Sequence, residues 1–186
     1  MVLHSAYFMN FSLLMVICFL LVMTATVCDL KHRKIPNMVV LTGAAVGLLL
    51  GALAGPGGIL TAVFGLLVGL AVLIPGYLLG FTGAGDAKLM AAVGTFLGPL
   101  GAFQAALASI LAGSAIAIGY IVFAVLFRQT ASPMARYGLM AKTLVTTGRP
   151  IYIAPEKGEV MGRKFPFAVA IAIGTTGWMI WQWPLS

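Results

Sequence analysis

The stretch FTGAGDAKL, residues 81–89, places Asp86 beside a glycine-rich turn, with long apolar runs on both sides. The chain has only four acidic residues, and two of them are aspartates. The other aspartate, Asp29, closes the first apolar run. An ionisable group inside or at the rim of a membrane helix bundle is costly, so both aspartates are candidate functional residues. We expect the helices around them to bring the two carboxyl groups together at one face of the membrane.

The composition is typical of an integral membrane protein. Of the 186 residues, 61% are apolar and only 8% are charged, which is far less charge than a soluble domain carries. The net charge of +7 comes from basic residues clustered between apolar runs, which indicates membrane topology and no nucleic-acid partner. We therefore predict an all-α fold, a polytopic bundle of about six transmembrane helices that forms one integral membrane domain over residues 1–186.

The apolar runs give the bounds of the predicted helices. They cover residues 7–27, 37–54 and 59–81, a helix from 87 to about 98, a fifth helix ending near 127, and residues 165–183. We interpret residues 1–27 as a retained helix, because no Lys or Arg precedes the apolar stretch as in a signal peptide. Glycines at positions 43, 47 and 51 predict a groove for close helix contact.

The fourth predicted helix leaves two alternatives open. It starts at Ala87 and meets Gly98 and Pro99 about a dozen residues later, which is short for a full span. Either the helix begins below the membrane surface, which we favour because it would sink Asp86 inward, or the Gly-Pro pair kinks a longer helix.

The charged loops all fall on one side of the predicted membrane. Residues 28–37, 83–88 and 128–164 carry basic residues, whereas the turn at 55–58 carries no charge. Because basic loops stay in the cytoplasm, both aspartates should face the cytoplasm and both termini should lie outside. Pro36 suits the first turn of the second helix, where its missing N–H costs nothing. The 128–164 loop is expected to contact membrane lipids, in part as an interfacial helix.

The residue inventory limits the chemistry of a membrane hydrolase. His4 and His32 lie outside the predicted spans, an H-E-x-x-H motif is absent, and Cys18 has no base near it in sequence. We identify no metal ligands and expect no cofactor. A pair of aspartates remains, and such a pair works by sharing one proton, with the carboxylate activating a water and the acid protonating the carbonyl oxygen.

Several neighbours of the aspartates are candidate support residues. Gly83 and Gly85 would permit positive φ and a close approach of a substrate strand to the turn. Lys88 lies two residues beyond Asp86, where it would modulate the acidity of the pair or contact an acidic substrate residue. It is also consistent with a plain positive-inside charge.

The segment GAGDAKL, residues 83–89, resembles the G-x-G-D-x-K-L motif of the type IV prepilin peptidases. Asp29 followed by Ile35, Pro36 and Asn37 resembles the first-aspartate motif of that family, D-x(5)-I-P-N. The segment KFPFA, residues 164–168, is similar to its K-x-P-[YF]-A segment at the start of the last helix. The three motifs occur in the family's order over nearly the whole chain.

This resemblance implies a function. It makes Asp29 and Asp86 the catalytic pair and Gly83, Gly85, Lys88, Pro36 and Asn37 support residues. The substrates would be prepilins, cut after a short basic leader at the cytoplasmic face of a bacterial inner membrane. The chain lacks the insert with two cysteine pairs of the bifunctional members, so no methyltransferase activity is expected. It resembles the short members that serve tight-adherence (Flp) pili. The sequence leaves the oligomeric state open.

The alternative reading is a proton- or ion-coupled transporter in which Asp29 and Asp86 form a relay. Transporters commonly contain internal repeats, and we find no convincing similarity between the two halves of this chain.

Overall fold

The structure is a computed structural model, and it describes residues 2–79, 82–126, 142–143, 146 and 166–182. Most of the predicted basic loop, 128–164, for which an interfacial helix was expected, lies outside these residues. The chain divides into two compact units, Met1–Gly113 with Pro166–Ser186 and Ser114–Phe165. Both aspartates belong to the first unit.

The described residues form helices, and none of them lies in a strand. The helices are α1 (Val2–His32), α2 (Asn37–Leu53), α3 (Pro56–Leu78), α4 (Ala84–Leu126) and α6 (Phe167–Gln182). Three stretches in this part of the chain are long and apolar enough to cross a membrane, Ser12–His32, Pro56–Leu78 and Ala84–Tyr120, and α2 and α6 are shorter apolar helices. The predicted all-helical membrane fold is confirmed.

Several predicted helix ends were wrong. Helix α3 runs from Pro56 to Leu78 instead of over 59–81, and two further differences concern the candidate site. Helix α1 continues to His32 instead of stopping at Val27, so Asp29 lies in its last turn. A helix does not stop where apolarity stops, because its backbone hydrogen bonds continue and basic residues are favourable at its C-terminus. Helix α4 begins at Ala84 instead of Ala87, so Asp86 lies inside its first turn.

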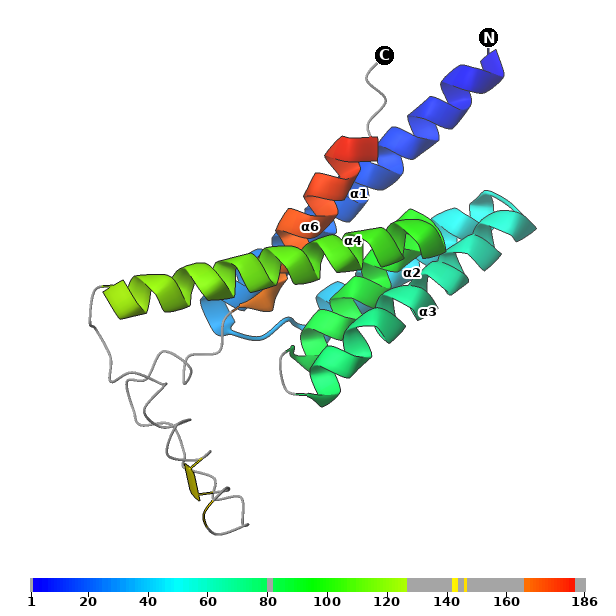
Figure 1. The fold of residues 1–186 in the computed structure, drawn as a ribbon. Coiled ribbons are helices and arrows are strands. Elements are labelled where there is room, and N and C mark those ends of the chain that lie inside the picture. Colours follow the sequence, from blue (N-terminus) through cyan, green and yellow to red (C-terminus); the bar gives the residue numbers. More distant parts are fainter. Residues whose placement is uncertain (1, 80–81, 127–141, 144–145, 147–165, 183–186) are drawn as a thin grey trace. The chain divides into compact units, whose positions relative to one another are not determined.

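Gly98 divides α4 into two helical segments, 84–97 and 99–126. Its φ of 69° and ψ of 179° are non-helical, and Pro99 follows directly. A φ of this sign is available to glycine at little cost, and the ribbon changes direction here (Figure 1). The Gly-Pro pair therefore kinks a longer helical run, as in the second alternative from the sequence. The favoured alternative, that the helix begins below the membrane surface, stays a prediction.

Glycines set the close contacts between helices. A Cβ at Gly43 would meet Leu21 of α1, one at Gly47 would meet Thr95 of α4, and one at Gly51 would meet Ala62 of α3. The three glycines of α2 that were predicted to form a groove therefore each pack against a different helix. Small residues allow such approach in membrane bundles, where packing replaces the hydrophobic drive between helices.

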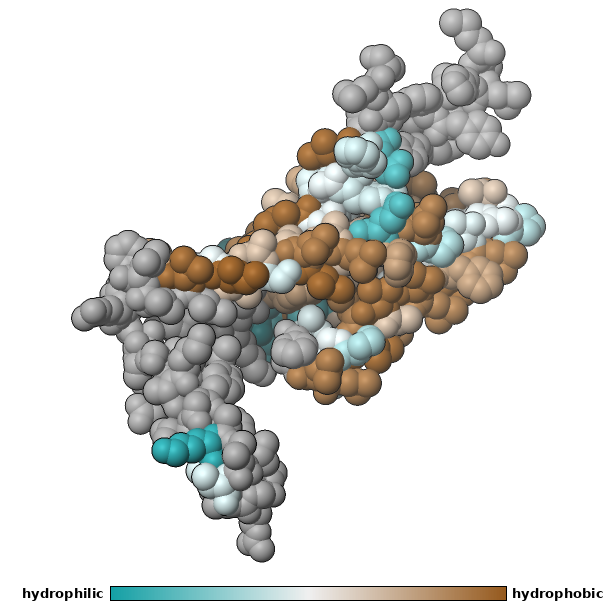
Figure 2. Space-filling view, in the orientation of Figure 1, coloured by the Kyte–Doolittle hydropathy of each residue, from teal (hydrophilic) through white to brown (hydrophobic). Residues whose placement is uncertain are grey.

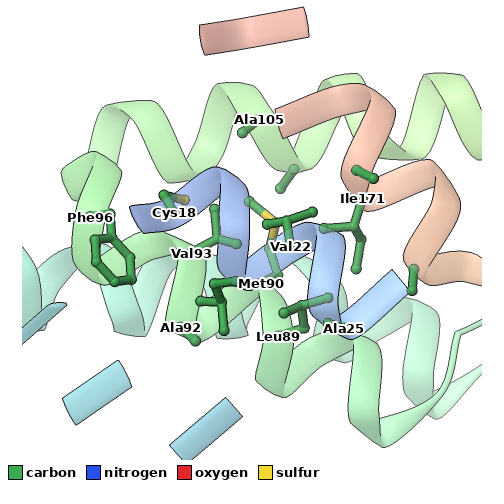
Figure 3. Close-up of a cluster of buried hydrophobic side chains, with 14 of the residues drawn as sticks. Cys18, Val22, Ala25, Leu89, Met90, Ala92, Val93, Phe96, Ala105 and Ile171 are labelled. Atoms are coloured by element: carbon green, nitrogen blue, oxygen red, sulfur yellow. The ribbon is translucent and has the colours of Figure 1, made fainter. Parts of the chain in front are cut away.

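The core of the first unit lies between α1, the first segment of α4, and α6. Side chains from these elements interdigitate in Figure 3, with Cys18 and Val22 from α1, Leu89 and Val93 from α4, and Ile171 from α6. Hydrophobic side chains also cover much of the outer surface in Figure 2, as expected for a protein in contact with lipid. The core therefore fixes the two helices that carry the aspartates and the start of α6 beside them.

Candidate active site

Asp86 is held by the turn that starts α4. The backbone N–H of Gly83 donates a hydrogen bond of 2.8 Å to Oδ2 of Asp86. In return, the carbonyl of Gly83 accepts bonds of 3.1 Å and 3.3 Å from the N–H groups of Asp86 and Ala87. An acidic side chain that reaches back from the third helical position to the residue before the helix is half of a capping box. Only 8% of Asp86 is exposed, so this bond supports a carboxyl group that is largely withdrawn from water.

The glycines of this turn act differently from the prediction. The positive-φ glycines among the described residues are Gly55 and Gly98, so neither Gly83 nor Gly85 uses a left-handed conformation. Gly85 instead allows a close approach, because a Cβ there would lie 3.3 Å from Cβ of Ile35. Ile35 belongs to the loop that follows α1. Gly85 therefore lets the loop beside Asp29 pack against the turn that carries Asp86.

Asp29 is held by another helix. The backbone of Ala168, the second residue of α6, hydrogen-bonds its carboxyl group, and Arg33 attracts it electrostatically. The first N–H groups of a helix have no acceptor within that helix, so the Ala168 N–H is free to serve a carboxylate from α1. Asp29 is 8% exposed, as buried as Asp86. Each aspartate is thus anchored by an N–H group at the start of a helix.

The two aspartates are neighbours in space. The loop after Asp29 packs against the turn that carries Asp86, through Ile35 and Gly85, and the two carboxyl groups are close enough to interact electrostatically. Two helices and three connecting loops separate them along the chain. Two like charges at short range favour a state in which the pair holds one proton. The structure therefore brings together the two aspartates that the sequence singled out.

The other predicted support residues lie beside this pair. Nζ of Lys88 donates a 3.2 Å hydrogen bond to Oδ1 of Asn37, the first residue of α2. Pro36 precedes that helix in an extended conformation and is its N-cap, one position earlier than the first-turn placement expected from the sequence. Lys88 and Asn37 thereby connect the start of α4 to the start of α2. In the described part of the chain, no three His, Cys, Asp or Glu side chains gather as metal ligands would.

A model of the type IV leader peptidase family matches residues 14–120. This region covers more than half of the chain and contains both Asp29 and Asp86. The chain belongs to the type IV leader peptidase family. The protein is accordingly a membrane peptidase with a pilin-like class of substrate. No curated protein and no solved structure is significantly similar to the chain.

The sequence did not single out one contact of this leader peptidase. Thr26 lies three residues before Asp29 on α1, and its hydroxyl group donates to the carbonyl of Ala168 at 3.2 Å. Residues three apart in a helix share a face, and this spacing was the available signal. The predicted end of the first helix at Val27 placed Asp29 in a loop, so the prediction did not put Thr26 and Asp29 on one helix face.

Proposed function

We propose that this protein is an aspartic-type endopeptidase that removes the leader peptide of type IV, Flp-like prepilins, with Asp29 and Asp86 as its catalytic pair. The observation that carries the proposal is that two buried aspartates from distant parts of the chain lie on segments that pack together, through Ile35 and Gly85. Burying a carboxyl group in a membrane protein costs several kcal/mol, so the presence of such a group points to a function. Two such groups on segments that pack together, in a member of a peptidase family, are best explained as a catalytic pair.

The pair would hydrolyse a peptide bond with one shared proton. The ionised carboxylate takes a proton from a water molecule, and the water oxygen attacks the scissile carbonyl carbon while the protonated carboxyl group donates its proton to the carbonyl oxygen. The C–N bond of the tetrahedral intermediate then breaks, and the leaving amine takes up the proton that came from water. The first aspartate is thereby returned to its carboxylate form. As the product carboxyl group forms, one hydroxyl group of the intermediate returns its proton to the second aspartate.

We place the site at the cytoplasmic face of a bacterial inner membrane, with both chain termini outside. The support for this placement is the positive charge beside both aspartates, because basic loops stay on the cytoplasmic side. Lys31, Arg33 and Lys34 are exposed at the end of α1, where they would also attract anionic lipid. The whole chain would act as one peptidase domain without methyltransferase activity.

The remaining candidates have supporting roles in this proposal. Gly83 anchors Asp86 through its N–H, and Gly85 lets Ile35 approach the turn. Lys88 and Asn37 hold the start of α4 near the start of α2, and Pro36 sets the direction in which the chain enters α2. These contacts would fix the geometry of the pair, and a substrate peptide would be held next to the same turn.

The experiment is cleavage of a purified Flp-type prepilin by the detergent-solubilised protein, scored as the mass lost with the leader. The wild-type protein should cleave, and Asp29→Asn and Asp86→Asn should each abolish cleavage, because neither carboxyl group works alone. Asparagine has nearly the same shape as aspartate, so folding should be retained. Thermal unfolding of each variant in the same detergent is the control for folding.

Two results would contradict the proposal. If either Asn variant still cleaves at the wild-type rate, the aspartates are not a catalytic pair. If the wild-type protein does not cleave any Flp-type prepilin but moves protons across vesicles in an Asp-dependent manner, the pair would be a relay.

A further inference from the structure

We propose that Thr26 is a positioning residue for Asp29 and acts through the backbone of Ala168. This inference rests on the proposed function, in which Asp29 is catalytic. Thr26 and Asp29 lie in one turn of α1 and both bind the same residue at the start of α6. The hydroxyl group of Thr26 donates to the Ala168 carbonyl at 3.2 Å, and the Ala168 backbone hydrogen-bonds the Asp29 carboxyl group.

Two side chains of α1 thus bind the backbone of one residue of α6. Thr26 and Asp29 are each 8% exposed and Ala168 is fully buried, so water does not compete freely for these groups. The single proton of the Thr26 hydroxyl group is shared between the Val22 carbonyl at 2.8 Å and the Ala168 carbonyl at 3.2 Å, as a three-centre bond. In the proposal, this bond holds Ala168 in its position along α1 and keeps its N–H directed at Asp29. The Asp29 carboxyl group is then fixed in direction as well, which a proton-sharing pair requires.

A second threonine on the same helix shows what is particular to Thr26. Thr24 donates to the carbonyl of Leu20 at 2.7 Å, and Thr26 donates to the equivalent carbonyl of Val22 at 2.8 Å. Such bonds to the preceding helical turn are common for threonine in helices. Thr24 is exposed, whereas the hydroxyl group of Thr26 is shared with a second acceptor on α6. Thr24 is therefore a matched control in the same helix.

Loss of the Thr26 hydroxyl group should affect the chemical step more than substrate binding. Without it, the start of α6 can slide along α1, and the Ala168 N–H turns away from Asp29. A misplacement of about 1 Å at a reacting group costs on the order of 100-fold in rate. The Asp86 turn is held by its own bond to Gly83 and should be unaffected.

The test measures kcat and KM for cleavage of a Flp-type prepilin by Thr26→Val, Thr26→Ser and Thr24→Val. Valine keeps the shape of threonine and removes the hydroxyl group, and serine keeps the hydroxyl group. We expect Thr26→Val to lower kcat by about 10- to 100-fold with little change in KM. Thr26→Ser should recover most of that loss, and Thr24→Val should behave as the wild-type protein does. If Thr26→Val does not fold, Thr26→Ala removes the same group and carries the same expectation.

Asp29→Asn in the same assay separates two kinds of failure. If Asp29→Asn cleaves normally, the proposed function itself is wrong. If Asp29→Asn is inactive and Thr26→Val has the wild-type kcat, only the positioning role is wrong. The positioning role is also wrong if Thr24→Val lowers kcat as much as Thr26→Val, or if Thr26→Ser fails to restore activity in a folded protein.

Discussion

The two aspartates are held in similar ways but over very different distances along the chain. Asp86 takes its N–H bond from Gly83, three residues away, at the start of its own helix. Asp29 takes its bond from Ala168 on α6, and the accompanying Thr26 contact spans 142 residues. The Asp86 anchor therefore needs only one helical turn, whereas the Asp29 anchor needs two helices packed in the correct register.

This difference indicates which aspartate is more sensitive to substitutions elsewhere in the chain. A reach-back bond in the first turn forms wherever the local backbone is helical. The Asp29 anchor depends on every contact that sets the position of α6 against α1 and α4. Changes far from both aspartates should therefore act through Asp29 more readily than through Asp86.

The largest expected effect comes from removing either carboxyl group of the pair. If general acid–base catalysis by the pair contributes about 10²–10⁴-fold, Asp29→Asn and Asp86→Asn should each remove it. The double variant should be no slower than either single variant, because residues that act as a unit show strongly non-additive losses. Single-turnover cleavage rates of the three variants check this. Independent, multiplicative losses would mean that the aspartates do not act as one pair.

A smaller effect should follow from moving α6 without touching either aspartate. A Cβ at Gly174 would overlap the backbone nitrogen of Ser109 on α4, so Gly174→Ala should force the two helices apart. Overpacking of this kind costs about 1–3 kcal/mol, and we expect a lower unfolding temperature in detergent together with reduced prepilin cleavage.

Gly177 provides the matched control on the same helix, since a Cβ there meets nothing within 4 Å. Gly177→Ala should leave cleavage unchanged and alter stability by no more than about 1 kcal/mol in the favourable direction. Equal losses for the two alanine variants would show that the α6 contact at Gly174 is unimportant.

The smallest expected effect concerns the link between Lys88 and Asn37. The bond is exposed and 3.2 Å long, so Lys88→Met and Asn37→Ala should each reduce cleavage only a few-fold. Because the residues are in contact, the double variant should be less impaired than the product of the single losses, with a coupling of about 0.5–1 kcal/mol. A double-mutant cycle on kcat/KM measures this. Strict additivity would mean that the two side chains serve cleavage separately.

The comparison also separates what sequence reasoning predicted from what it missed. The helical bundle and the start of α2 at Asn37 followed from apolar runs and from Pro36. The predicted C-terminal end of α1 and the predicted start of α4 were wrong because charge and apolarity mark where a membrane begins and not where a helix does. Backbone hydrogen bonds continue α1 to His32, and α4 begins at Ala84, three residues before the predicted start at Ala87.

By itself, the sequence determined the Asp86 half of the site. A glycine followed three residues later by an aspartate, at the start of an apolar helix, contains both partners of the bond that holds the carboxyl group. Only the tertiary structure decided the Asp29 half. Its donor is a backbone N–H with no side-chain signature, and its position depends on how closely small residues such as Gly174 allow α6 to approach α4. That register is a property of packed helices, and a linear pattern of residue types does not contain it.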